Sequence, residues 1–243
     1  MENKKWNEQI GKVPVYAHPR RRKRMWEDYV LGHTIEGGVI VEFGVADGGS
    51  IGWFTKKFPD TTVFGFDSFE GLPEDWMVDK TVLLPKGHFN RDGNPPDYDL
   101  TGEVTYVKGW FEDTVPEWKE NFKGYVKIVH IDSDLYSSCK IVLDNIKDKL
   151  RVGSLILFDE ITHLDGRDHE LKAFVEFCED NPTFDFEVLA RTTGPQAMIK
   201  VLITHQSCVK NLLTKVKILL NRMHQWVELM PRSKTRQPQV IWH

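Results

Sequence analysis

Short apolar runs and helical patterns alternate along the chain. The run Val39–Phe43 is nearly unbroken and rich in β-branched residues, which is typical of a strand buried on both faces of a parallel sheet. Similar runs predict strands at 62–69, 104–110, 125–134, 153–160, 184–190 and 196–203, and helical spacing of apolar residues predicts helices at 50–58, 137–150 and 170–178. This alternation indicates an α/β fold with a doubly wound, mostly parallel, Rossmann-like sheet. Because Arg191–Pro195 joins the last two strands without a helix, they form a C-terminal antiparallel hairpin.

Two segments flank this region, so we divide the chain into 1–35, 36–203 and 204–243. We expect residues 1–35 to form an N-terminal helical arm or lid. Trp26, Tyr29 and Val30 fall at helical spacing, so they should pack this arm against the rest of the chain. The arm also contains the basic cluster Arg20–Arg24. Such a cluster can mark a nucleic-acid or nuclear-import patch, but we favour the solvated face of a helix.

The C-terminal segment 204–243 reads as a basic amphipathic helix followed by a tail. Apolar residues from Leu212 to Val227 form one helical stripe, with lysines and Arg222 nearby. Helices of this kind can lie on a membrane surface or bind a partner's groove. We expect this helix to dock on its own chain or on a second subunit, and therefore expect a homo-oligomer.

Composition and charge narrow the function classes. The net charge is -4, and the segment before His205 carries the acidic excess, which argues against nucleic acid as a partner. Cys139, Cys178 and Cys208 are far apart and follow no Cys-x-x-Cys pattern, so neither a disulfide framework nor a zinc site is indicated. No apolar run approaches the ~18 residues of a membrane span, and the N-terminus lacks a signal-peptide pattern. We expect a cytoplasmic protein.

A glycine-rich turn follows the first predicted strand. The spacing of Gly44, Gly48 and Gly49 is G-x-x-x-G-G rather than the G-x-G-x-x-G of dinucleotide-binding turns. Glu42 precedes the first glycine by two positions, which favours a cofactor without phosphates and places Glu42 against a cationic or hydrogen-bond-donating group. A ligand-free strand-to-helix turn is the alternative. Ser50 begins the following helix.

Acidic residues follow four of the predicted strands, and parallel strands bring their carboxyl ends to one edge of the sheet. A group of carboxylates is unfavourable unless a cation balances it, and an all-oxygen ligand set favours Mg²⁺, Ca²⁺ or Mn²⁺ over Zn²⁺. On an extended chain, two acids separated by one residue project to the same side. The strand-end acids are Glu42, Asp67, the pair Asp132 and Asp134, and the pair Asp159 and Glu160.

Five motifs occur in a recognisable order between about residues 36 and 203. They are Val41–Ser50, Phe64–Pro73, Gly109–Pro116, Ile131–Ser138 and Phe158–Glu160. This series resembles the macrocin O-methyltransferase (TylF/MycF) family of class I S-adenosylmethionine-dependent methyltransferases. The resemblance implies the class I methyltransferase fold, with a seven-stranded sheet that ends in the antiparallel hairpin.

The resemblance also implies which residues form the site. The ribose of S-adenosylmethionine would bind Asp67, and Gly109–Phe111 would flank the adenine. Mg²⁺ or another divalent cation would be held by Asp134, Asp159 and Glu160. The full set of implied cofactor-binding residues is Glu42, Gly44, Asp47, Gly48, Gly49, Ser50, Asp67, Ser68, Gly109, Trp110, Phe111 and Asp132.

The candidates for catalysis are the two acids Asp132 and Asp134 and two histidines. His88, in a loop, is a candidate general base, although a lone loop histidine is more often a surface residue without a catalytic role. His163, three residues after Glu160, is a similar candidate.

The predicted function is metal-assisted methylation of a hydroxyl on a small molecule, a sugar or a glycosylated metabolite. The alternative is a non-catalytic nucleoside- or glycan-binding Rossmann-like module. A nicotinamide-dependent enzyme is disfavoured by the glycine spacing and by the lack of a Tyr-x-x-x-Lys pattern. Residues 70–103, rich in Pro, Gly, Asp and Asn, predict a long ordered lid with one short helix. Because this lid departs from the family pattern, the resemblance does not identify the acceptor.

Overall fold

The computed structural model describes residues 3–17, 21–97, 102–162, 169–204 and 217. Residues Met1–His205 form one compact unit and Gln206–His243 a second, and every helix and strand named below belongs to the first. The C-terminal helix predicted at 204–243 lies outside the described residues, except for Thr204 and Lys217. Among the helices that the structure describes, none is both long and apolar enough to cross a membrane.

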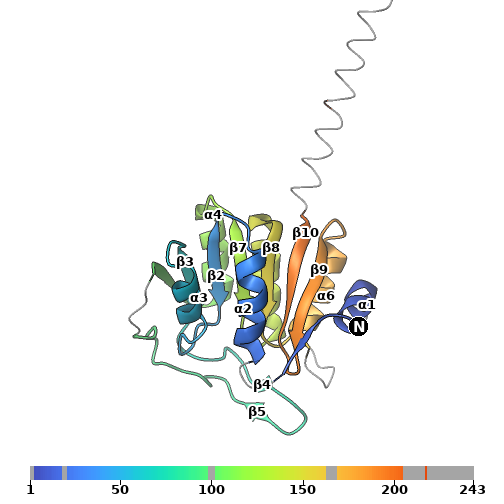
Figure 1. Cartoon of the computed structure of the whole chain (residues 1–243). Helices are drawn as coiled ribbons and strands as arrows, with labels where there is room; N and C mark the ends of the chain where they lie inside the picture. Colours follow the sequence, from blue (N-terminus) through green and yellow to red (C-terminus); the bar gives the residue numbers. More distant parts are fainter. Residues whose placement is uncertain (1–2, 18–20, 98–101, 163–168, 205–216, 218–243) are drawn as a thin grey trace, which may run out of the picture. The chain divides into compact units, whose positions relative to one another are not determined.

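An eight-stranded sheet forms the centre of the first unit, in the order β1-β9-β10-β8-β7-β2-β3-β6 (Figure 1). All its pairings are parallel except those of β10, which runs antiparallel to both β8 and β9. The predicted doubly wound sheet and its terminal hairpin are therefore confirmed. The strands are β1 (Val15–Tyr16), β2 (Val39–Phe43), β3 (Val63–Asp67), β6 (Val104–Lys108), β7 (Val126–Ile131), β8 (Leu150–Phe158), β9 (Asp185–Thr192) and β10 (Ala197–Ile203).

The eighth strand, β1, comes from the arm that the sequence pattern predicts as helical. Seven strands match the predicted ones, and the two residues of β1 pair in parallel with Arg191 and Thr192 of β9. An edge strand exposes unpaired backbone groups, and β1 covers part of that edge. Two residues are too few to show a strand periodicity, so only the tertiary structure reveals this pairing.

Helices cover both faces of the sheet. On one face lie α2 (Arg21–His33) and α3 (Ile51–Lys57), which stand in front of the sheet in Figure 1. The other face is covered by α1 (Lys4–Ile10), α4 (Phe111–Asn121), α5 (Tyr136–Ile146) and α6 (Glu170–Asp180). The predicted packing of the arm through Trp26 and Val30 is confirmed, since both side chains are buried.

The segment after β3 forms a small hairpin rather than the predicted loop with a short helix. Its strands are β4 (Trp76–Met77) and β5 (Leu83–Leu84), which pair antiparallel. Leu72 and Trp76 pack against Leu135, which anchors the hairpin near the start of α5. This segment contains too few apolar residues to show a clear helical or strand periodicity, so the sequence could not distinguish a short helix from a hairpin.

The turn after β2 passes very close to the end of β7. Gly44 has a φ of +88°, and a Cβ at this position would lie 1.9 Å from the carbonyl oxygen of Asp132. No side chain fits there without moving backbone, so Gly44 sets how closely the two strand ends approach each other.

We predict that Gly44→Ala destabilises the fold by about 3 kcal/mol or more, because it combines a positive φ with a backbone clash. Gly49→Ala in the same turn is the matched control. Nothing lies within 4 Å of a Cβ there, so this change should alter stability by less than about 1 kcal/mol. Chemical unfolding of both variants measures the difference. Equal stabilities would contradict the steric role of Gly44.

Candidate active site

A cavity of about 190 Å³ opens at the carboxyl ends of the central strands. Ligands bind at this edge of parallel α/β sheets, where the strand order reverses. The reversal falls between β2 and β7, since β3 and β6 lie on one side of them and β8 on the other. The cavity is lined by Gly44, Val45, Ala46, Asp67, Ser68, Gly71, Leu72, Pro73, Phe89, Gly109, Trp110, Phe111, Glu112, Asp132, Ser133, Asp134 and Ser138.

The structure brings most of the predicted cofactor-binding residues to this cavity. Those in its wall are Gly44, Asp67, Ser68, Gly109, Trp110, Phe111 and Asp132. Those that do not line it are Glu42, Asp47, Gly48, Gly49 and Ser50. The turn therefore presents its first residues to the cavity, and its later glycines serve the transition into α3.

Asp67, at the end of β3, organises the turn that faces it. Its Oδ2 accepts hydrogen bonds from the backbone N–H groups of Val45 at 2.9 Å and Ala46 at 2.8 Å, and its Oδ1 accepts one from Phe69 at 2.7 Å. A carboxylate offers about four acceptor sites, so one remains for a ligand in the cavity. Ala46 has a φ of +43°, a strained conformation that these bonds hold in place.

Glu42 lies behind the cavity and is completely buried. Its Oε1 accepts a hydrogen bond from the Ser50 hydroxyl at 3.1 Å, and its Oε2 lies 3.5 Å from His130 Nδ1. The donor and the cation expected opposite Glu42 are thus supplied by the chain itself.

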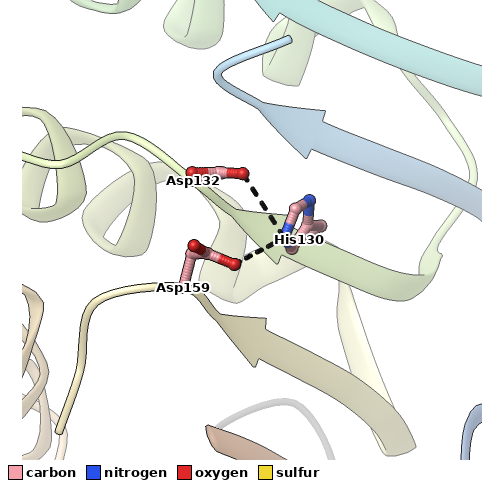
Figure 2. A group of neighbouring side chains, drawn as sticks. All are labelled: His130, Asp132 and Asp159. Atoms are coloured by element: carbon pink, nitrogen blue, oxygen red, sulfur yellow. Dashed lines mark ion pairs between the residues drawn. The ribbon is translucent and has the colours of Figure 1, made fainter. Parts of the chain in front are cut away.

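His130 forms the centre of a buried charge cluster at the ends of β7 and β8. Figure 2 shows the Asp132 and Asp159 carboxylates on the same side of its ring, each joined to it by a dashed line. His130 Nε2 lies 4.0 Å from Asp132 Oδ2 and 3.9 Å from Asp159 Oδ1. The ring is fully buried and touches Trp26 and Phe54 edge-on. Burial lowers the pKa of His130, but the surrounding carboxylates outweigh it and raise the pKa to about 9. His130 is therefore a cation at neutral pH.

Arg22, from α2, contacts the same two carboxylates from above the strand ends. Its Nη1 donates to Asp132 Oδ2 at 3.2 Å and to Asp159 Oδ1 at 2.5 Å. The predicted solvated basic face is correct for Lys23 and Arg24, which are exposed, and wrong for Arg22. Arg22 points inward because it shares the buried face of α2 with Trp26, four residues on.

The pKa values of Asp159 and Asp132 shift in opposite directions in this cluster. Burial raises the pKa of Asp159, but pairing with His130 and Arg22 outweighs it and lowers the pKa below its ordinary value. Burial and the neighbouring charge of Asp159 raise the pKa of Asp132. Gln196 adds a further hydrogen bond to Asp159 Oδ2 at 3.3 Å. Asp159 is thus the fixed anion of the pair.

Asp134 lies in the cavity wall but not where strand geometry predicts it. The strand β7 ends at Ile131, and Asp134 adopts a φ of +62°, so its carboxyl group does not follow the alternation expected from an extended chain. Burial, reinforced by the charges of Asp132, Asp159 and Asp67, raises the pKa of Asp134 to about 8. The group is balanced between its acid and base forms near neutral pH.

Glu160 follows Asp159 and is also held in a low-dielectric setting. Burial and the charge of Asp159 raise its pKa to about 9. Its backbone N–H donates to the buried Glu170 Oε2 at 3.0 Å. Neither Glu160 nor Asp134 belongs to the group whose ligand atoms converge within 4.8 Å, which consists of His130, Asp132 and Asp159. Of the predicted metal ligands, only Asp159 is in that group.

The remaining candidates lie away from the centre. His88 does not line the cavity. Its ring packs against Phe89, which does line the cavity. Asp47 pairs with Arg91 on the surface of the turn. His163 lies outside the described residues.

Sequence reasoning missed His130 and Arg22. A histidine at the end of an otherwise apolar buried strand was the available signal for the first. For the second, the signal was its spacing of four residues from Trp26, which places both on one helix face. It also missed several residues of the cavity wall, such as Leu72 and Phe89 from the segment after β3 and Ser138 from α5.

The family described as Macrocin-O-methyltransferase (TylF) matches residues 22–179, more than half of the chain. The chain belongs to this family. The matched range includes Arg22, His130 and every described residue of the strand-end acid cluster. The resemblance seen in the five motifs is thereby confirmed.

Two relatives are named as O-methyltransferases, and the name of the first specifies a rhamnosyl-bearing substrate. The 8-demethyl-8-(2,3-dimethoxy-alpha-L-rhamnosyl)-tetracenomycin-C 4'-O-methyltransferase of Streptomyces olivaceus is 30% identical over 145 residues, covering 51% of this chain and 52% of that protein. The demethyldecarbamoylnovobiocin O-methyltransferase of Streptomyces niveus is 28% identical over 148 residues, covering 54% and 55%. The chain thus matches about half the length of these relatives.

Solved structures show the same fold. The calicheamicin methyltransferase CalS11 has a TM-score of 0.56 at 23% identity, covering 75% of this chain and 80% of that one. The O-methyltransferase NovP gives 0.54 at 22% identity, covering 74% and 77%. An O-methyltransferase from Bacillus cereus, solved in complex with SAH, gives 0.52 at 13% identity, covering 83% and 92%. The class I methyltransferase fold is therefore confirmed.

We predict that the stability of the fold declines as the pH rises above neutral, in part through His130. A pKa raised from 6.5 to about 9 means that the imidazolium stabilises the fold fully below pH 6.5 and loses this effect as the pH rises through about 9. Its share is about 1.4 kcal/mol per pH unit within that window. Urea unfolding of wild type and His130→Leu across the window measures it. The exposed His33→Leu is the control, and equal slopes in wild type and His130→Leu would refute the assignment.

Proposed function

We propose that this chain is an S-adenosylmethionine-dependent O-methyltransferase that methylates a hydroxyl of a small, sugar-bearing molecule. The observation that carries the proposal is the placement of Asp67 and Asp134 in the wall of one cavity at the strand-order reversal. Asp67 has the chemistry to accept ribose hydroxyls, and Asp134 has the chemistry to accept a proton. Family membership supports the reaction class.

The cofactor side of the cavity is built from β2, β3 and the start of α4. The free acceptor site on Asp67 would bind a ribose hydroxyl, and the rings of Trp110 and Phe111 would flank the adenine. Bound S-adenosylmethionine supplies an electrophilic methyl group. Gly44 leaves the backbone open to close approach, because it has no Cβ.

Asp134 would act as the general base. Its carboxylate would accept the proton of the acceptor hydroxyl, and the oxygen would then take the methyl group that bound S-adenosylmethionine would supply. A base is most effective when its pKa lies near the working pH, and burial raises the pKa of Asp134 to about 8. Asp132 and Asp134 both line this cavity, which supports a role for them in positioning the acceptor hydroxyl.

The predicted Mg²⁺ does not fit the residues as they are arranged. The converging group consists of His130, Asp132 and Asp159, and Arg22 already binds both of its carboxylates. A metal ligand histidine must be neutral, whereas His130 lies between three carboxylates that favour its charged form. We therefore derive no catalytic step through a metal ion.

The acceptor class rests on the relatives, whose names specify a rhamnosyl-tetracenomycin and a novobiocin intermediate. On the acceptor side the wall contains Leu72, Pro73 and Phe89 from the lid segment. These apolar groups suit the uncharged face of a sugar or an attached ring system. We also propose that the protein acts as a homo-oligomer through its C-terminal segment, as the apolar stripe predicts.

We predict that Asp67→Ala weakens S-adenosylmethionine binding by about 5- to 150-fold, which corresponds to the 1–3 kcal/mol of a lost buried hydrogen bond. Calorimetry measures the change. Asp79→Ala is the matched control, because Asp79 also accepts backbone N–H bonds in a loop but does not line the cavity. Wild-type affinity in the Asp67 variant would disprove the ribose assignment.

We predict that Asp134→Asn lowers kcat by about 10²- to 10⁴-fold, the typical contribution of a general base, with cofactor affinity nearly unchanged. Wild-type kcat/KM should rise with pH until about pH 8, because only the deprotonated carboxyl accepts a proton. The variant should lack this rise. Asp144→Asn, on the exposed side of α5, controls for loss of charge. Full activity in the Asp134 variant would favour a non-catalytic binding module or another base.

A further inference from the structure

Arg22 occupies the position from which a bound cation would act on the strand-end carboxylates. We propose that Arg22 is the resident cation of this edge: its guanidinium positions Asp132 and Asp159, so that methyl transfer needs no added metal ion. This inference rests on the proposed methyl transfer. It makes Arg22 a positioning residue, since it contacts Asp132 in the cavity wall rather than the cavity itself.

The charges around His130 require a second cation. Glu42, Asp132 and Asp159 surround this one imidazole at 3.5–4.0 Å, so His130 alone leaves an excess of negative charge in a buried setting. Uncompensated buried charge is strongly destabilising. Arg22 supplies the missing positive charge by direct ion pairs with two of the three carboxylates.

Arg22 is built into the site rather than resting on it. The guanidinium lies 5.1 Å from the ring centroid of Trp26, and the same indole contacts His130 at 5.0 Å. Met25, Trp26 and Val30 are at most 1% exposed, so α2 is fixed to the sheet directly beside Arg22. One buried indole thus packs against both cations of the cluster.

Arg22 and a divalent ion would compete for the same oxygen atoms. The atoms that Arg22 Nη1 contacts, Asp132 Oδ2 and Asp159 Oδ1, are also those closest to His130 Nε2 in the converging group. A divalent ion bound to these oxygens would lie close to the guanidinium and would be repelled by its positive charge. Removing the guanidinium leaves carboxylates in a converging arrangement that attracts a divalent ion.

The test compares wild type, Arg22→Gln, Arg22→Lys and the matched control Lys23→Ala, which removes an exposed charge from the same helix. Mn²⁺ binding is measured by electron paramagnetic resonance. Methyl transfer is measured with excess chelator and with added Mn²⁺. Arg22→Lys keeps the charge and provides a folded reference if Arg22→Gln is unstable.

We expect wild type, Arg22→Lys and Lys23→Ala to be insensitive to chelator and to bind Mn²⁺ weakly. Arg22→Gln should bind Mn²⁺ at least about tenfold more tightly, with activity that is reduced in chelator and partly restored by Mn²⁺. Wild-type activity that vanishes in chelator, or equal Mn²⁺ affinity in wild type and Arg22→Gln, would overturn the proposal. The Mn²⁺ titration needs no turnover, so it decides the role of Arg22 even if the proposed methyl transfer fails.

Discussion

Mutual repulsion among the strand-end carboxylates is the constraint on which this site depends. Parallel strands deliver their carboxyl ends to one edge of the sheet, so the topology gathers acids such as Asp132 and Asp159 there. Such a group is stable in a buried setting only with matching positive charge. His130 provides it from within the sheet and Arg22 from the helix above, and together they hold both carboxylates in defined positions.

Positive charges do not neutralise all the carboxylates around the cavity to the same extent. Asp159 is paired with cations and has a lowered pKa. Among the described residues Asp134 has no such cationic partner, and burial raises its pKa to about 8. One edge of the sheet thus contains both a permanent anion and a group that exchanges its proton near neutral pH. This division is what the general-base role that we propose for Asp134 requires.

The N-terminal arm is part of the site. The helix α2 buries Met25, Trp26 and Val30 against the sheet and carries Arg22 to the carboxylates. The cofactor side depends on other contacts: the bonds that Asp67 accepts from the turn after β2, and the close approach of Gly44 to Asp132. The two halves meet at Asp132, which lines the cavity and pairs with Arg22.

The sequence by itself determined the order of strands and helices, the terminal hairpin, the family, and several residues of the cavity wall, including Gly44, Asp67 and Phe111. These follow from local patterns: apolar periods, glycine turns and acids at strand ends. Only the tertiary structure decided that Glu42 faces Ser50 and His130, that Arg22 points inward, and that Asp134 leaves the strand geometry. The reason is physical: the pairings of Arg22 with Asp132 and of Glu42 with His130 join residues that are far apart in the chain, and local periodicity does not record such pairings.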